Sequence, residues 1–202
     1  MERNKSLLNP ESTQSFWNAR WASKQTGWDI GYAAPAIAKY IDSIADTNLR
    51  VLIPGCGNAY EASYLLEKGF TNVTLIDIAP IAVLNARNKF KDQPGVTVLE
   101  GDFFELESQF DLIIEQTFFC AIDPSLRPQY IQKMASLLVP EGRLVGLLFN
   151  TDFEKEGPPF GGHIAEYHPA FSAYFDIHKM EECYNSIRPR AGSELFINLQ
   201  KH

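Results

Sequence analysis

From about Asn48 onward, short apolar runs alternate with amphipathic stretches along the chain. Continuous apolar runs of a few residues are typical of strands buried on both faces of a parallel sheet, and amphipathic stretches are typical of helices that cover such a sheet. The pattern therefore predicts an α/β fold in which helices pack on both faces of one sheet.

The strands predicted in this part of the chain are Leu49–Pro54, Val73–Asp77, Val96–Glu100, Phe110–Gln116 and Arg143–Phe149. The helices predicted between them are Ala59–Lys68, Pro80–Phe90 and Pro128–Leu138. Asn58 is placed to cap the first helix and Gly69 to end it, because Asn favours N-cap positions and glycine readily takes a left-handed conformation. Pro140 and Gly142 are expected to separate the third helix from the strand that follows.

The alternation changes in the last third of the chain. Gly157–Gly162 reads as a loop rich in glycine and proline, and a helix is predicted near Ile164–Phe171. Two final strands are predicted near Ile177–Tyr184 and Glu194–Gln200. A closing hairpin would complete a seven-stranded mixed sheet with one antiparallel strand, and residues 1–202 are expected to form a single domain.

Composition and charge narrow the possible partners. A length of 202 residues leaves little room beyond one domain. The net charge is −7 and no Lys/Arg cluster is present, so we expect no nucleic-acid partner. No apolar run approaches the roughly 18 residues of a spanning helix, and the N-terminus lacks the apolar stretch of a signal peptide, so we expect no membrane association.

The cysteines and histidines suggest neither a disulfide framework nor a metal site. Three widely spaced cysteines, Cys56, Cys120 and Cys183, include no C-x-x-C pair. The four histidines show no metal-ligand spacing. The prediction is a cytoplasmic protein without a bound metal.

The sharpest local signal for a ligand follows the first predicted strand, in the loop Pro54-Gly55-Cys56-Gly57-Asn58. Gly55 and Gly57 allow a tight turn and a close approach of backbone to ligand. The dinucleotide fingerprint requires a third glycine where Tyr60 stands. This departure argues against an NAD(P)-dependent oxidoreductase, which we keep as the less favoured alternative.

Two carboxylates follow the next two predicted strands. Asp77 ends the second strand, twenty residues after Gly57, where a carboxylate can accept both hydroxyls of a ribose. Asp102 follows the third strand beside Phe103, and this pair suits the amino group and the ring face of an adenine. The combination predicts an adenosine-bearing cofactor, and S-adenosylmethionine fits best because it has no pyrophosphate. The structural alternatives are that Asp77 is a helix N-terminal charge and Asp102 a turn residue.

All three tryptophans lie near the N-terminus. Trp17 and Trp21 are four residues apart and would share one face of a helix, and Trp28 follows shortly after. The segment precedes the predicted sheet, so residues 1–45 are predicted to form an arm that packs over the cofactor site as a lid. The alternative is that the three indoles fill a core.

Four stretches resemble the thiopurine S-methyltransferase family, and within it the thiol and halide methyltransferases. They are Phe16–Ile37, VLIPGCGNAYEASYLLEKGF, EQTFFCAIDPSLRPQYIQKMASLLVPEGRL and the EGPPF loop. The resemblance runs from about Phe16 to Lys201 and implies a class I methyltransferase fold with S-adenosylmethionine as cofactor. It also implies a monomer, because members of this family are often monomeric. It further implies a cofactor pocket lined by Trp17, Trp21, Trp28, Gly55, Asp77, Asp102, Phe103 and Gln116.

The sequence departs from this family at two positions. The plant enzymes of this type carry a tyrosine where Gln116 stands, so the contact expected at this position differs from theirs. Ala79 stands where a serine would better cap the helix that begins at Pro80, and we expect this to affect stability more than activity.

The predicted chemistry is methyl transfer to a small soft nucleophile: a thiol, a thiopurine or a halide. Such an acceptor needs alignment more than a general base, although a nearby cation would help a neutral thiol to lose its proton. Arg190, just before the last strand, is the candidate catalytic cation, ahead of Arg127 and Arg188. The alternative from another class is a non-catalytic domain that binds S-adenosylmethionine.

Overall fold

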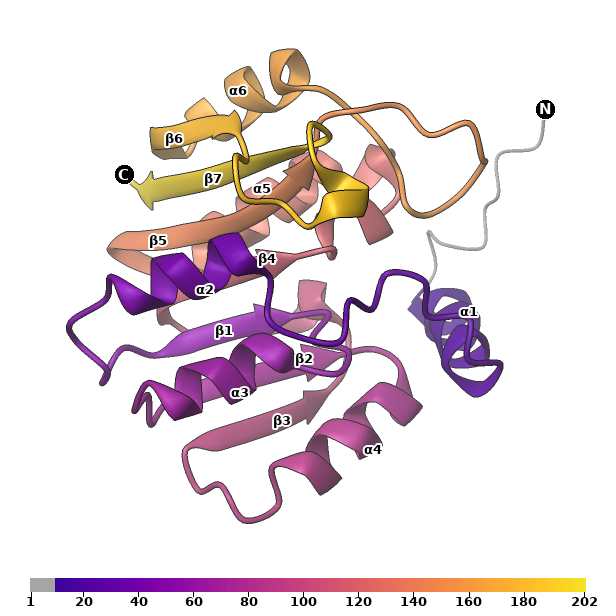
Figure 1. Cartoon of the computed structure of the whole chain (residues 1–202), viewed down its shortest axis with the longest axis vertical. Helices are drawn as coiled ribbons and strands as arrows, with labels where there is room; N and C mark the ends of the chain where they lie inside the picture. Colours follow the sequence, from indigo (N-terminus) through magenta and orange to yellow (C-terminus); the bar gives the residue numbers. More distant parts are fainter. Residues whose placement is uncertain (1–9) are drawn as a thin grey trace.

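Seven strands form one mixed sheet in the order β3-β2-β1-β4-β5-β7-β6 (Figure 1). The computed structural model describes residues 10–202, apart from the side chains of Pro10 and Ser12. The strands are β1 Val51–Pro54, β2 Val73–Asp77, β3 Val96–Glu100, β4 Phe110–Gln116, β5 Leu138–Phe149, β6 Phe175–Glu182 and β7 Glu194–Lys201. Strands β1 to β5 run parallel, and β7 is antiparallel to both β5 and β6. The predicted mixed sheet is confirmed.

Helices cover both faces of this sheet, as the apolar strands require. The helices are α1 Pro10–Ala22, α2 Pro35–Asp42, α3 Tyr60–Glu67, α4 Pro80–Lys89, α5 Arg127–Leu137 and α6 Ile164–Ser172. Val51 and Ile53 of β1 belong to the core that contains side chains of α2, α3 and α4. Leu52, between them, belongs to the core beneath α5 and α6. Successive residues of β1 thus pack into opposite cores, because side chains alternate between the two faces of a sheet.

The start of α3 differs from the prediction. Asn58 does not cap this helix, because its side-chain Nδ2 donates instead to Oδ2 of Asp29, at 2.5 Å. The N-cap residue is Ala59, which has a φ of +49° and no side-chain cap. Gly69 does take the predicted left-handed conformation after the helix, with a φ of +90°.

Strand β5 begins five residues earlier than predicted, directly after α5. Leu138 already pairs with Phe110 of β4, and the register then shifts before Arg143 pairs with Leu112. Pro140 and Gly142 therefore lie in an irregular part of the strand and do not separate helix from strand. Strand β6 likewise begins two residues earlier than predicted, at Phe175.

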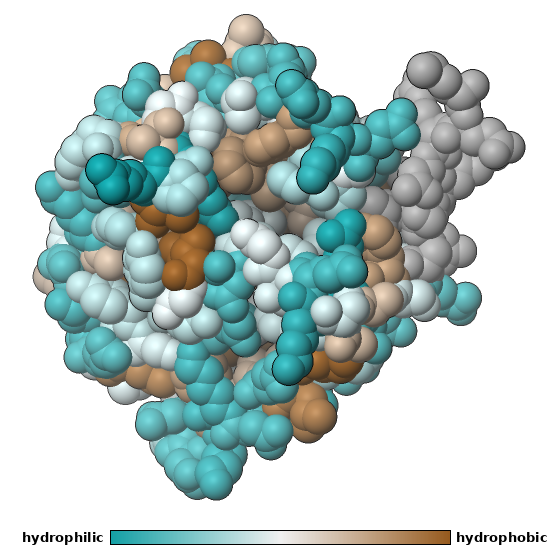
Figure 2. Space-filling model, turned by 45° about the vertical axis from the view of Figure 1, so that its right-hand side comes forward, coloured by the Kyte–Doolittle hydropathy of each residue, from teal (hydrophilic) through white to brown (hydrophobic). Residues whose placement is uncertain are grey.

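The outer surface shows no large apolar face in the view of Figure 2. Hydrophobic side chains form separate small patches among hydrophilic ones (Figure 2). Within the described part of the chain, no helix has the length and hydrophobicity needed to cross a lipid bilayer.

Helix α1 lies beyond the carboxyl ends of the parallel strands (Figure 1) and packs against α4. The N-cap residue of α4, Ala79, offers no side-chain acceptor to the free N–H groups of the first turn. Asn18 of α1 replaces it, because its Oδ1 accepts a hydrogen bond from the backbone N–H of Ile81, at 3.1 Å. The helix that the sequence leaves uncapped is thus capped by a residue 63 positions earlier in the chain.

Replacing Asn18 with Ala should therefore lower the free energy of unfolding by about 0.5–2 kcal/mol, the usual effect of removing an N-cap acceptor. Urea titration measures this change. Asn88→Ala on the exposed side of α4 is the matched control, and it should be neutral or slightly stabilising because Ala has the higher helix propensity. Equal effects of the two substitutions would show that the bond to Ile81 contributes nothing.

Candidate functional site

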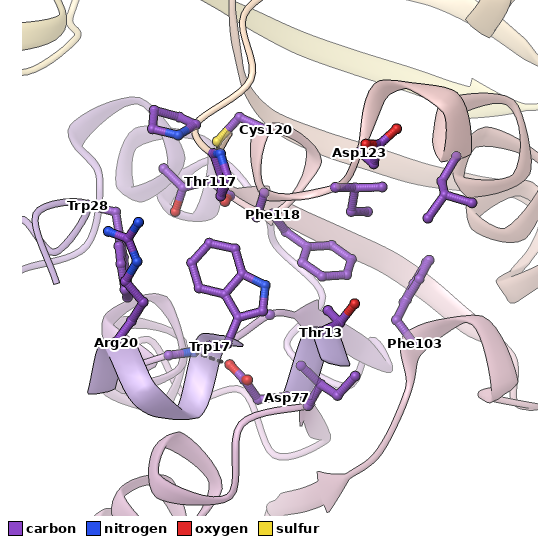
Figure 3. Close-up of a pocket in the computed structure, with 18 of the residues that line it drawn as sticks. Thr13, Trp17, Arg20, Trp28, Asp77, Phe103, Thr117, Phe118, Cys120 and Asp123 are labelled. Carbon is purple, nitrogen blue, oxygen red and sulfur yellow. Dashed lines mark hydrogen bonds between the residues drawn. The ribbon is translucent and has the colours of Figure 1, made fainter. Parts of the chain in front are cut away.

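A cavity of about 700 Å³ opens beyond the carboxyl ends of the parallel strands. Its walls come from α1 and from the turns that follow β1, β2, β3, β4 and β5, together with the turn before β7 (Figure 3). In open α/β sheets this edge is where ligands bind, because the crossing connections diverge there. The cavity is large enough for a nucleoside with a side group.

Most of the predicted site residues meet at this cavity. Those that line it are Trp17, Trp21, Trp28, Gly55, Gly57, Asp77, Asp102, Phe103 and Arg190. Gln116 does not, and instead lines a smaller hollow of about 50 Å³. The two hollows share Trp28, Gly55, Gly57 and Thr117 as wall residues. The placement agrees with the predicted roles, which stay predictions.

The turn after β1 needs its glycines. Gly55 has a φ of +56° and Gly57 a φ of +50°, a conformation that side chains rarely tolerate. A Cβ atom on Gly55 would lie 2.4 Å from Cδ2 of Phe118. The aromatic ring from the turn after β4 can therefore rest directly on the backbone of the glycine loop.

Asp77 is a buried carboxylate that organises two turns. Its Oδ2 accepts from the N–H of Gly57, at 3.0 Å, and its Oδ1 accepts from the N–H of Ala79, at 2.9 Å. Burial raises the pKa of Asp77, and the two N–H donors partly oppose this rise. Each carboxylate oxygen keeps capacity for a further donor, so hydroxyl groups of a ligand can still bind there.

Asp102 and Phe103 follow β3 and open the short 3₁₀ turn η2, Phe103–Glu105. The Oδ1 of Asp102 accepts from the N–H of Phe104, at 2.9 Å, so this carboxylate is a turn residue as well as part of the cavity wall. The ring of Phe103 packs edge-on against that of Phe118, with centroids 5.2 Å apart. Together these two rings give one side of the cavity an apolar surface.

The three tryptophans form a cluster on the opposite side. The centroid of Trp28 lies 5.4 Å from that of Trp17 and 5.9 Å from that of Trp21, in near-perpendicular arrangements. Trp17 projects from α1 into the middle of the cavity, between Asp77 and Phe118 (Figure 3). The indoles are half-buried and form the cavity wall, so they do not fill a closed core. That the arm acts as a lid stays a prediction, and its first nine residues lie outside the described part.

Arg190 ends the short turn η5, Arg188–Arg190, and is held in place by two partners. Its Nη2 donates to the carbonyl oxygen of Trp28, at 2.8 Å, and its Nη1 pairs with Oε1 of Glu194, at 3.3 Å. Its side chain is only 11% exposed, so the alternative of a surface charge is wrong.

The other two candidate arginines lie elsewhere. Arg127 does not line the cavity and donates to the carbonyl of Gly161, at 2.7 Å. Arg188 is exposed. Among the three, Arg190 is the cation that reaches the cavity.

Glu115 is the important residue that the sequence reasoning missed. It is fully buried near the end of β4, and it accepts from the N–H groups of Phe118 and Phe119, at 2.8 and 2.9 Å. The hydroxyl of the buried Tyr130 donates to its other oxygen. Burial raises the pKa of Glu115 to about 7, although the hydrogen bonds from these donors act to lower it. The signal was present in the sequence, because a charged residue inside the apolar run FDLIIEQ needs internal partners.

These contacts fix the turn that carries cavity residues from β4. Thr117 has a φ of +58°, which is unusual for a β-branched residue and is retained because Glu115 holds the N–H groups that follow. Phe118 and Cys120, from the same turn, both line the cavity (Figure 3). Glu115 therefore shapes the site without lining it.

Comparison with known proteins gives a consistent result. The family model described as thiopurine S-methyltransferase matches residues 12–195. A probable thiol methyltransferase 2 from Arabidopsis thaliana is 33% identical over 193 residues, which cover 93% of this chain and 85% of that protein. Thiocyanate methyltransferase 1 from Brassica oleracea is 30% identical over 203 residues, covering 93% of this chain and 89% of that protein.

The fold is also similar to that of solved methyltransferases. One is the 1,6-didemethyltoxoflavin-N1-methyltransferase of Burkholderia thailandensis, crystallised with S-adenosylhomocysteine. It superposes with a TM-score of 0.74 and covers 93% of this chain and 86% of its own, at 18% identity. At this identity the likeness concerns the fold alone.

The raised pKa of Glu115 predicts a specific pH dependence of stability. A group whose pKa is higher in the folded state than its usual 4.5 stabilises the fold at low pH, and this stabilisation is lost as the pH rises through about 7. Glu115→Gln removes the titration. The unfolding free energy of the wild type, relative to that of the variant, should therefore fall by on the order of 2 kcal/mol between pH 5 and pH 8.

Urea titrations at several pH values provide the measurement. Glu107→Gln changes an exposed glutamate of the same chain and is the control. Its unfolding free energy should vary with pH in parallel with that of the wild type. If the unfolding free energy of Glu115→Gln also varies with pH in parallel with that of the wild type, the pKa of Glu115 is not raised.

Proposed function

The chain belongs to the thiopurine S-methyltransferase family, and from this premise we propose that its acceptor is a small soft nucleophile, namely a thiol, a thiopurine, thiocyanate or a halide ion. It is an S-adenosylmethionine-dependent methyltransferase, so the oxidoreductase alternative is set aside. The proposal concerns the acceptor and the residues that serve it.

The residues of the cavity fit the cofactor. The Oε1 atom of Gln116 is buried without a hydrogen-bond partner in the smaller hollow, whose wall also includes the carboxyl groups of Asp29 and Glu61. An unpaired acceptor beside two acids suits a positively charged amino group, such as that of the methionine part. The glycine loop borders both hollows, so one extended molecule could reach from one to the other.

Within the larger cavity, we assign Asp77 to the ribose and Asp102 with Phe103 to the adenine. Asp77 is held rigidly by the N–H groups of Gly57 and Ala79, so it needs little reorganisation to accept hydroxyl donors. Phe103 and Phe118 provide the apolar surface for a base. The cofactor supplies a methyl group bound to a positively charged sulfur, which makes it open to direct displacement.

The acceptor would lie at the other end of the cavity, against a surface that we name the C-terminal wall. Its members are Phe149, Phe153, Pro158, Pro159, Pro189, Arg190 and Ser193. They come from the end of β5, the loop that follows it and the turn before β7. Apolar side chains dominate this wall, and its charged member is Arg190.

One observation carries the choice of acceptor: a cationic side chain set in an apolar wall. Such a surface can orient a small anion through the guanidinium N–H groups while excluding water. A strongly hydrated acceptor fits it poorly. The names of the relatives, a thiol methyltransferase and a thiocyanate methyltransferase, support the same class of acceptor. The free N–H donors of Arg190 would also favour the thiolate over the thiol, because hydrogen bonds stabilise the charged form.

Methyl transfer from labelled S-adenosylmethionine to a panel of acceptors tests the proposal. The panel is bisulfide, a small aromatic thiol, a thiopurine, thiocyanate and iodide. We expect turnover with at least one, and the ranking identifies the preferred acceptor. Binding of the cofactor without transfer to any member would contradict the proposal and favour a domain that binds S-adenosylmethionine without catalysis.

Asp77→Asn should weaken S-adenosylmethionine binding about tenfold or more, because a charge-assisted hydrogen bond to a hydroxyl contributes roughly 1.5–3 kcal/mol. Calorimetry gives the dissociation constant. Asp92→Asn, an exposed aspartate after α4, controls for the loss of one charge. If the affinity of Asp77→Asn equals that of this control, the ribose assignment is wrong.

A further inference from the structure

Arg190 is not an isolated charge, and this changes what the C-terminal wall can recognise. Its partner Glu194 is only 3% exposed and lies at the start of β7, four residues further along the chain. The carboxyl Oε1 lies 3.3 Å from Nη1 of the guanidinium. The pair is therefore shielded from water, and its two charges largely compensate each other near the cavity.

The remaining contacts of Arg190 leave hydrogen-bond capacity but little net field. A guanidinium has five N–H groups; one on Nη1 is directed at Glu194 and one on Nη2 at the carbonyl of Trp28, which leaves three for other acceptors. The guanidinium carbon also lies 5.6 Å from the ring centroid of Phe149. An anion at this wall would thus find free N–H donors and aromatic contact, without the full attraction of an unpaired cation.

Where the electrostatic field of the site is weak, the free energy needed to dehydrate an anion decides which anion binds best. An apolar wall forces an anion to give up hydration, and this cost is lowest for large anions of diffuse charge. A strong field reverses the preference, because Coulomb attraction grows as the distance of closest approach shrinks and so favours small anions. Other charged groups act here as well, because Glu61 interacts electrostatically with Arg190 and Arg20 lines the same cavity. Glu194 contacts the guanidinium directly, so its charge decides which regime applies.

We propose that Glu194 is a specificity-determining residue, which compensates the charge of Arg190 and thereby makes the acceptor site prefer weakly hydrated anions, such as thiocyanate and iodide, over chloride. This inference rests on the proposed function, since it assumes that the acceptor meets the C-terminal wall. It assigns Glu194 a role other than structural support for Arg190, and the two roles predict opposite effects.

Anion affinities in the presence of S-adenosylhomocysteine separate the two roles without any turnover. Glu194→Gln keeps a hydrogen-bond acceptor and removes the negative charge. We expect thiocyanate to bind about tenfold more tightly to this variant, and chloride to gain more than thiocyanate, because the field of Arg190 is no longer compensated. Calorimetric titration measures both constants. Weaker binding of all anions would assign Glu194 a supporting role alone and overturn the proposal.

Two further variants sharpen the result. Glu182→Gln, an exposed glutamate at the end of β6, changes the net charge equally and should leave anion affinities unchanged. Glu194→Asp keeps the charge and should keep the preference for thiocyanate over chloride. If Glu194→Gln does not fold, the wild type and Glu194→Asp decide the question, because equal affinities for thiocyanate and chloride in both would overturn the proposal.

The pH profile of methyl transfer to a thiol gives an independent readout. With the field of Arg190 uncompensated, the pKa of the bound thiol is lowered, so kcat, which reports the enzyme–substrate complex, should reach its plateau at a lower pH in Glu194→Gln than in the wild type. An unshifted profile would contradict the proposal. A wild type that methylates none of the panel would instead overturn the proposed function, so the two failures are distinguishable.

Discussion

The site depends on buried carboxylates that accept hydrogen bonds from the backbone N–H groups of the turns beyond the strands. Each parallel strand ends in a turn whose N–H groups have no partner in the sheet, and a buried N–H without a partner is costly. Asp77 at the end of β2 accepts from the turn after β1 as well as from its own turn, and Glu115 accepts from the turn after β4. These bonds fix the glycine loop and the ring of Phe118 relative to each other, and the cavity lies between them. The shape of the cavity therefore follows from the hydrogen bonds that these carboxylates accept from backbone N–H groups.

The parts of this arrangement that were predictable from sequence are those set by local pattern and by topology. Apolar runs locate the strands, and parallel strands bring their carboxyl ends to one edge, so Asp77 and Asp102 could be placed together beforehand. Asn58 does not cap a helix as predicted, and Gln116 lines a separate hollow that the sequence did not indicate, for a common reason. Asn58 bonds to Asp29, which is far away in sequence, and Gln116 faces a hollow formed by the arm and the glycine loop. Such contacts depend on how distant segments pack, which the local pattern does not encode.

The N-terminal segment is bound to the rest of the fold by polar bonds as well as by its tryptophans. Asn18 caps α4, and the carbonyl of Trp28 accepts from Arg190 near the other end of the chain. The first bond lies beside the turn that Asp77 organises, and the second lies at the C-terminal wall. The arm is therefore attached at both ends of the cavity, so a change in its position would alter the surroundings of the cofactor and of the acceptor together.

Charge is distributed unevenly between the two ends of the cavity. Of the charged residues given a role, Asp77 and Asp102 lie at the end assigned to the cofactor, and the compensated pair of Arg190 and Glu194 lies at the end assigned to the acceptor, while Arg20 of α1 also lines the cavity. The proposed reaction brings a cation and an anion together and consumes both charges. Water stabilises such separated charges better than the transition state in which they are partly neutralised, so a surface of low net field assists the reaction by withholding that stabilisation. A fully exposed cation at the acceptor end would bind the anion more tightly before reaction, and this tighter binding would have to be overcome when its charge is lost. The Arg190–Glu194 pair therefore suits turnover as well as selectivity, because it orients an anion without holding it strongly.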